Sequence, residues 1–319
     1  MKNGFVFSKF SVANFASFVL LFLFISCNDN KDDNATPNPT GTITNVVSTN
    51  NNFSLLKSAV VKAGLAETLG DAGPYTVFAP DDNAFNSSGI TSSVIASIPA
   101  DQLKNILLYH TLGSKVAAAD VPAGPNAEVS AVNGETLYLT KNNKGVFVNG
   151  WKVTTADISA SNGIIHSIEH VLTPPSGNLV ETAQSNSNLT YLVAAVQRAS
   201  QGNTNVLQVL SSAGPYTVFA PTNQAFIDAG FPTVASIQAA DPNTLAAILT
   251  YHVLSARAFS SDLIDGQNLT TLNGATIKIG LGSQATVKGN SNTAAANISA
   301  VNIMATNGVV HVIDKVLLP

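Results

Sequence analysis

The chain has 319 residues, of which 45% are hydrophobic and 11% are charged, and its formal net charge at pH 7 is -4. This length suggests about two domains, and the apolar fraction is typical of a globular protein. The weak negative charge, without any run of basic residues, excludes nucleic acid as a partner. Ser, Thr and Asn supply much of the polar surface, which suits an extracytoplasmic, β-rich protein.

The first 27 residues follow the plan of a secretory signal peptide, with a basic start, an apolar segment and small residues at the end. The charge comes from Lys2 and Lys9, and residues 10–25 are mostly apolar. The apolar segment is short for a membrane span. We therefore expect residues 1–27 to direct export and not to belong to the fold.

The only cysteine of the chain, Cys27, ends this leader and cannot form an intrachain disulfide. Residues 23–27 (Leu-Phe-Ile-Ser-Cys) resemble the lipobox of bacterial lipoproteins, with Phe24 at the position where leucine is more common. The resemblance implies that cleavage leaves Cys27 as a lipidated first residue, which anchors the protein in a membrane without a transmembrane helix. The alternative is an ordinary cleaved signal with an incidental cysteine.

Residues 28–41 are polar and interrupted by proline, which predicts a flexible tether. Asp29, Asp32 and Asp33 follow the cysteine closely and resemble the surface-export signals of some Gram-negative lipoproteins. The alternative is a solvated spacer. The anchor and tether together predict an outer-membrane lipoprotein exposed at the cell surface, although the sequence leaves a periplasmic orientation open.

Residues 72–80 read Ala-Gly-Pro-Tyr-Thr-Val-Phe-Ala-Pro and are repeated without change at 213–221. The Gly-Pro pair predicts a turn, the β-branched and aromatic residues predict a short buried strand, and the last proline ends that strand. Asp81 and Thr222 then stand where a helix N-cap is expected. The long spacing between the two copies predicts two whole domains and not a solenoid of short repeats.

We place the two domains at 42–175 and 179–319, joined by a short linker that contains Pro-Pro. In each domain, a helical pattern precedes the repeated strand, a helix opened by proline follows it, and alternating strands complete the domain. The expected elements are a helix at 55–63, a helix at 99–110 with its copy at 242–252, alternating strands at 135–140, 146–153, 275–279 and 285–288, and closing strands at 163–172 and 308–318.

Short motifs in the same order in both domains resemble fasciclin domains. Tyr-Thr-Val-Phe-Ala-Pro, followed by Asn and Ala-Phe, is similar to the first family signature. Residues 307–319 closely resemble the second signature, and 163–172 is a looser copy of it. The resemblance covers about residues 42–319. It implies an α+β fold of two tandem fasciclin-like domains, each a wedge-like β-sandwich packed with helices, and no cofactor.

The resemblance also implies function, because fasciclin domains are mostly adhesion and interaction modules at cell surfaces. In animal members, a tyrosine–histidine motif and an Asp-Ile pair upstream of the second signature are associated with integrin adhesion. The second domain has Asn302 in place of the aspartate, which removes a carboxylate that would coordinate a metal in such a receptor. The candidate binding residues are Tyr109, His110, Asp157, Ile158, Tyr251 and His252.

Several patterns that suggest chemistry have structural explanations. Residues 166–170 (His-Ser-Ile-Glu-His) match a metalloprotease pattern that requires a helix. The segment reads as a strand, in which positions four apart lie about 13 Å from each other and cannot share a zinc ion. His110 and His252 fall on apolar helix faces, where a hydrogen-bonded core role is the alternative to ligand contact. No nucleophile motif occurs, so we expect no catalytic residue and no bound metal.

The leading hypothesis is a non-enzymatic, lipid-anchored surface protein that binds protein or matrix partners in adhesion. The alternative is a glycan- or small-ligand-binding accessory lipoprotein of an uptake system. In that case Trp151 and Tyr138 would stack on sugars from an exposed groove. The competing explanation for both rings is that they are buried in the core.

Overall fold

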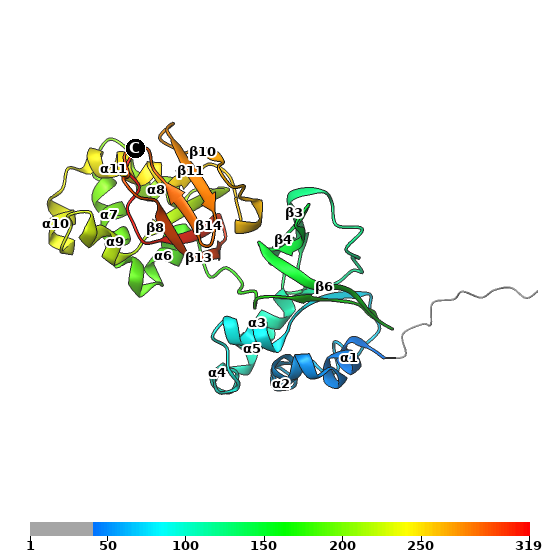
Figure 1. Cartoon of the computed structure of the whole chain (residues 1–319). Helices are drawn as coiled ribbons and strands as arrows, with labels where there is room; N and C mark the ends of the chain where they lie inside the picture. The colour runs from blue at the N-terminus through cyan, green and yellow to red at the C-terminus, as the bar shows by residue number, and fades with distance from the viewer. Residues whose placement is uncertain (1–40) are drawn as a thin grey trace, which may run out of the picture. The chain divides into compact units, whose positions relative to one another are not determined.

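The computed structural model describes residues 41–319. The predictions of a signal peptide at 1–27, of a lipidated Cys27 and of nearly all of the tether at 28–41 concern residues outside this range. Within the described range, no helix is long and apolar enough to cross a membrane. The described chain contains a similar succession of helices and strands twice, first from blue to green and then from green to red in Figure 1.

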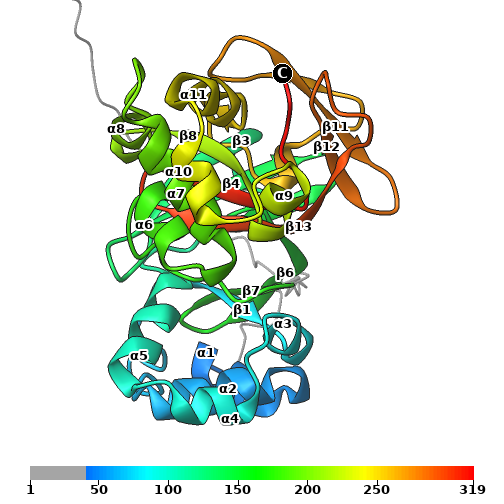
Figure 2. The ribbon, with the colours of Figure 1, turned by 90° about the vertical axis from the view of Figure 1, so that its left-hand side faces the viewer.

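Short helices gather on one side of the sheet in each domain (Figures 1 and 2). Those of the first domain are α1 (Ile43–Thr49), α2 (Ser54–Lys62), α3 (Asp82–Ser87), α4 (Ser92–Ser97) and α5 (Ala100–Tyr109). Those of the second domain are α6 (Leu179–Gln184), α7 (Thr190–Ala199), α8 (Val206–Ser211), α9 (Asn223–Asp228), α10 (Val234–Ala239) and α11 (Pro242–Tyr251). Single 3-10 turns lie at η1 (Asn51–Phe53), η2 (Ser187–Leu189) and η3 (Ser260–Asp262).

The two N-caps expected after the repeated stretch are present. The Asp81 carboxylate accepts a hydrogen bond from Ala84 N at 2.8 Å, at the start of α3. Thr222 Oγ1 accepts one from Ala225 N at 3.2 Å, at the start of α9. Each cap satisfies a backbone donor that the first turn of the helix leaves without a partner.

Each domain has one seven-stranded sheet. The strands of the first are β1 (Tyr75–Pro80), β2 (Thr111–Leu112), β3 (Gly124–Ser130), β4 (Thr136–Asn142), β5 (Gly145–Val148), β6 (Trp151–Ala160) and β7 (Gly163–Ile168). Those of the second are β8 (Tyr216–Pro221), β9 (Val253–Leu254), β10 (Asn268–Thr270), β11 (Thr276–Leu281), β12 (Ala285–Lys288), β13 (Ala296–Ala305) and β14 (Gly308–Ile313). Their orders are β2-β1-β7-β6-β5-β4-β3 and β10-β11-β12-β13-β14-β8-β9.

The repeated stretch forms β1 and β8, and each pairs in parallel with the closing strand of its own domain. In β1, Val77 and Ala79 pack against the helices, whereas Phe78 packs against side chains of β4, β5 and β7. In β8, Phe219 takes the place of Phe78. Burial on both faces explains why this strand is apolar at successive positions and does not alternate.

The sheet changes direction at β6 and β13, where the pairing register shifts in bulges. Asp157 and Asn302 lie at these bulges with φ of 60° and 61°. Asp and Asn tolerate this left-handed conformation better than other residues with a side chain. A bulge increases the local twist and bends the strand, so β3, β4 and β5 can fold over Phe78. Each domain is thus a nearly closed sheet packed with helices, which confirms the predicted α+β fold.

Candidate functional site

The tyrosines of the two tyrosine–histidine motifs are buried, and each joins a helix to the sheet by a hydrogen bond. Tyr109 Oη donates to the Thr136 carbonyl at 3.0 Å and accepts from Asn149 Nδ2 at 2.9 Å. Tyr251 Oη donates to the Thr276 carbonyl at 2.6 Å. Burial raises the pKa of Tyr109 above its ordinary value, against the opposing effect of the Asn149 hydrogen bond. Because both rings are fully buried, neither tyrosine can contact a partner at the surface of the folded domain.

The histidines of the same motifs end their helices inside the core. His110 Nδ1 donates to the Ile106 carbonyl at 2.8 Å, and its Nε2 accepts from Leu172 N at 2.9 Å. His252 makes the same two bonds, to the Ile248 carbonyl and from the backbone of the segment after β14. Burial lowers the pKa of each histidine to about 4. These neutral imidazoles therefore join the helix end to the chain that follows the closing strand, as hydrogen-bonded residues of the core.

The Asp-Ile pair of the first domain lies on the β6 bulge. Asp157 N donates to His166 Nδ1 at 3.2 Å, and Asp157 Oδ1 accepts from Ala118 N at 3.0 Å. The residue as a whole is exposed, and the neighbouring Ile158 is half-buried against the core beneath the helices. The aspartate thus fixes the loop between β2 and β3 while its carboxylate faces solvent. Among the six candidate binding residues, only Asp157 is exposed.

The residue at the equivalent position in the second domain, Asn302, is buried. Asn302 Oδ1 accepts from Ser260 N, and its Nδ2 donates to Ser260 Oγ, both at 2.8 Å. Asn302 is 5% exposed. Asn and Asp therefore serve the same backbone function at the bulge, and the exposed carboxylate is a property of the first domain.

The metalloprotease-like segment begins on a strand and contains no helix, since its residues 166–168 lie on β7. His166 lies on β7, stacks on Phe78 with ring centroids 5.7 Å apart, and donates from Nε2 to the Val116 carbonyl at 2.8 Å. His170 lies beyond the end of β7 and stacks on Trp151 instead. The two imidazoles therefore have separate structural roles.

The two aromatic residues of the glycan hypothesis differ in exposure. Tyr138 is 9% exposed, with the ring of Phe259 at 5.8 Å and the guanidinium carbon of Arg257 at 4.2 Å. Trp151 is half-buried, and the ring of His170 covers one face of its indole, with the ring centroids 3.8 Å apart. Tyr138 cannot stack on a sugar, so the glycan hypothesis depends on the remaining face of Trp151.

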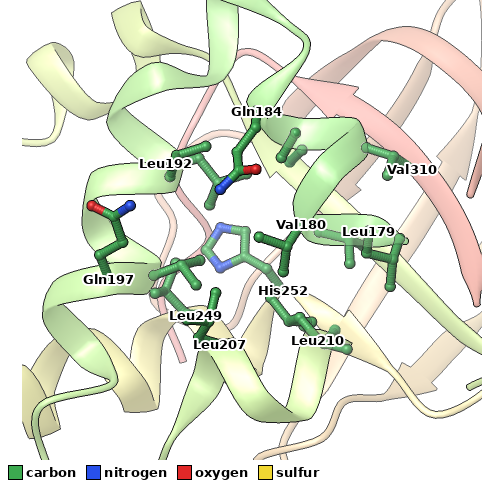
Figure 3. A pocket seen from close by; sticks show the side chains of 16 residues that line it. Leu179, Val180, Gln184, Leu192, Gln197, Leu207, Leu210, Leu249, His252 and Val310 are labelled. Atoms are coloured by element: carbon green, nitrogen blue, oxygen red, sulfur yellow. The ribbon is translucent and has the colours of Figure 1, made fainter. Parts of the chain in front are cut away.

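A further site, which the sequence patterns do not indicate, is an apolar cavity within the second domain (Figure 3). It lies between α6, α7, α8 and α11 and reaches β8 and β14. His252 borders it, so one of the candidate residues contacts a space that a ligand could enter (Figure 3). Its other lining residues are mostly aliphatic and follow ordinary core periodicity, and for this reason the sequence does not distinguish them from packing residues.

The same fold is built twice along the described chain. The model of the fasciclin domain family matches residues 51–174 and 187–319, and the chain belongs to this family. The expectation of two fasciclin domains is thus confirmed.

Similar proteins occur in animals and in bacteria. The chain is 30% identical over 250 residues to the pig transforming growth factor-beta-induced protein ig-h3, covering 77% of this chain and 35% of that protein. It is 41% identical over 136 residues to protein sll1483 of Synechocystis, covering 42% of this chain and 74% of that protein. It therefore spans about a third of the length of its animal relative. A solved fasciclin I domain pair from an insect cell adhesion molecule is 20% identical, with a TM-score of 0.40, covering 83% of this chain and 97% of that one.

Proposed function

We propose that this chain is a bacterial surface lipoprotein that mediates adhesion, without enzymatic activity, by binding surface or matrix proteins through its fasciclin domains. Membership of a family of mostly adhesion and interaction modules supports the class of function. The carboxylate of Asp157 is exposed and is held on the β6 bulge. This observation identifies Asp157 as the residue that we expect to contact the partner.

The geometry at Asp157 suits recognition of a cation on a partner. The backbone at φ 60° and the hydrogen bond from Ala118 N hold the side chain in place, so binding costs little conformational entropy. Only Oδ1 has a partner among the described residues. The other oxygen is free to accept a charge-assisted hydrogen bond from Arg or Lys of a partner protein.

The membrane attachment is part of this proposal. A lipidated Cys27 would hold the two domains outside the cell at the end of the tether, with the partner surface on the first domain accessible. Acyl chains on one residue provide a stable anchor, and the acidic tether is the feature that favours the outer face of the outer membrane.

Asp157→Asn is expected to weaken binding to the partner by about tenfold or more and to leave the fold intact. Asparagine keeps the acceptor for Ala118 N and tolerates the left-handed backbone, as Asn302 does in the second domain, but it removes the charge. The loss of a charge-assisted hydrogen bond is worth about 1.5–3 kcal/mol. The measurement is attachment of cells and matrix proteins to the immobilised full-length chain, with the melting temperature as a check on folding.

A matched control is available at a carboxylate that is exposed and makes no such backbone contact. Asp101→Asn, on the first turn of α5, changes the net charge by the same amount. Wild-type attachment by Asp157→Asn, or an equal loss in both variants, would contradict the role of Asp157.

A further inference from the structure

The cavity of the second domain is apolar throughout its depth. Val180 of α6 and Leu207 and Leu210 of α8 supply aliphatic walls (Figure 3). Ala183 of α6 and Val193 of α7 also line the cavity. The sheet closes the far end through residues of β8 and β14. No charged side chain lines it among the described residues.

The interior of the cavity, behind its mouth, offers a water molecule no free polar partner. Its enclosed volume is about 30 Å³, which is enough to hold water, but buried water needs two to four hydrogen-bond partners. The one polar ring at its wall, His252, already uses Nδ1 on the Ile248 carbonyl and Nε2 on Leu317 N. An apolar space of this kind stays dry and favours an apolar occupant.

The first domain contains the same site in a shallower form, which allows a residue-by-residue comparison. Ile43 N and Leu179 N donate to Asn162 Oδ1 and Asn307 Oδ1, each at 2.9 Å, and this shared contact aligns α1 with α6. The counterpart cavity is lined by α1, α2 and the segment after α2, and by no strand residue. The deep part that reaches the sheet therefore belongs to the second domain.

Two substitutions between the domains change the lining at aligned positions. Counting from the aligned residues, Val47 of the first domain occupies the position of Ala183, and its larger side chain is buried in the core. Lys57 occupies the position of Val193, lines the counterpart cavity, and donates from Nζ to the Ser48 carbonyl at 3.2 Å. The second domain has a smaller side chain inside the cavity and an apolar one at its mouth.

Two amides stand at the mouth of the deeper cavity. Gln184 and Gln197 lie on either side of the opening (Figure 3). Both are exposed, and neither side chain makes a hydrogen bond to another residue within 41–319. Their NH₂ groups can donate to a polar head that remains outside while an apolar tail enters.

We propose that the second domain binds the saturated, unbranched acyl chain of a lipid, with the chain end in this cavity and the polar head at Gln184 and Gln197. The aliphatic walls select the chain, and the small enclosed volume excludes a ring. The head is recognised by amide donors and not by a cation, so an ester or an acid meets the same two groups. This site is separate from Asp157 and does not depend on the adhesion proposal.

The test uses decanoic acid as the probe and the full-length chain with ¹³C-labelled Val and Leu methyl groups. We expect chemical-shift changes centred on Val180, Val193, Leu207 and Leu210, and none at the counterpart residues Val47 and Val60 of the first domain. A second arm replaces the free acid with phosphatidylethanolamine vesicles. Shifts at the same methyl groups with vesicles would identify a membrane lipid as the source, and shifts only with the acid would identify a free one. No shift in either arm overturns the proposal.

Substitutions that copy the first domain provide the decisive comparison. Ala183→Val should weaken decanoic acid binding by about tenfold or more, because its added methyl groups fill the space that the chain end requires. The same variant should have a raised melting temperature, since filling a cavity stabilises the domain.

Val193→Lys tests the mouth of the cavity independently and should weaken decanoic acid binding as well. Val47→Ala is the matched control and should leave the second-domain shifts unchanged. Wild-type affinity in both Ala183→Val and Val193→Lys would show that the chain binds elsewhere.

Discussion

Acidification from pH 7 to about pH 4 is expected to destabilise the second domain strongly, through two buried histidines. Burial lowers the pKa of His252 and His311 in the second domain to about 4. In the first domain, burial lowers the pKa of His110 to about 4 and also lowers the pKa of His170. In the unfolded chain the pKa of each histidine returns to its ordinary value of about 6.5. His252 and His311 should therefore each remove on the order of 3 kcal/mol of stability from the second domain over this interval.

The sign follows from which state binds the proton. Between about pH 6.5 and pH 4 the unfolded chain takes up protons that the folded domain excludes. The contribution of these histidines to the free energy of unfolding is therefore fully present above this window and is lost as the pH is lowered through it. The folded domain excludes the proton because its only free imidazole lone pair accepts a backbone N–H. In His252 this donor is Leu317 N, and in His311 it is Asn302 N.

The measurement is urea unfolding at a series of pH values with two signals. Trp151, the single tryptophan of the chain, reports the first domain by fluorescence, whereas far-UV circular dichroism reports both. His252→Gln should reduce the pH dependence of the second domain by about half, even though its stability at neutral pH will be lower. A stability of the second domain that stays constant between pH 6.5 and 4 would be inconsistent with two neutral, buried histidines in its core.

Gly73→Ala is expected to unfold the first domain or to destabilise it by about 3 kcal/mol or more. A Cβ at Gly73 would stand 2.0 Å from the Asn162 carbonyl oxygen, and a Cβ at Gly214 would stand 2.0 Å from that of Asn307. These carbonyls accept from the first residue of β1 and β8, at 3.1 Å in both domains. Alanine would therefore push apart the start of the two parallel strands on which each core is built.

The control for this change is a glycine at which an added Cβ would meet no other atom. Gly113 has no heavy atom within 4 Å of an added Cβ and does not require a left-handed backbone. Gly113→Ala should therefore leave the first domain near wild-type stability in chemical denaturation. A Gly73→Ala variant as stable as Gly113→Ala would show that the close approach to Asn162 does not constrain the domain.

Much of the fold could be predicted because its signals are local and occur twice. The repeated stretch combines a turn, a doubly buried strand and a helix cap, and each of these has a residue-level cause at Tyr75–Pro80 and Asp81. The first helix at Ile43–Thr49 was not predicted, since its short amphipathic pattern adjoins the polar tether. The strand β3 was also missed, because the sheet exposes one of its faces and its pattern is weak.

The candidate site was harder to predict, because exposure is decided by tertiary packing. Tyr109 and His110 are motif residues in sequence, yet the structure uses them to join helix, sheet and closing segment. The roles of Asp157 and Asn302 depend on a bulge and on a left-handed backbone, which no periodic pattern reports. The lining of the cavity includes a small side chain, Ala183, in a position that is apolar in both domains.

The proposed function is tested most directly by attachment of living cells to a surface or matrix, measured in a strain that lacks the gene. We expect attachment to be lost in this strain, to be restored by the wild-type chain, and to remain absent with Cys27→Ser, which would no longer hold the domains at the membrane. Attachment equal to that of the parent strain after deletion would contradict adhesion as the function of this protein.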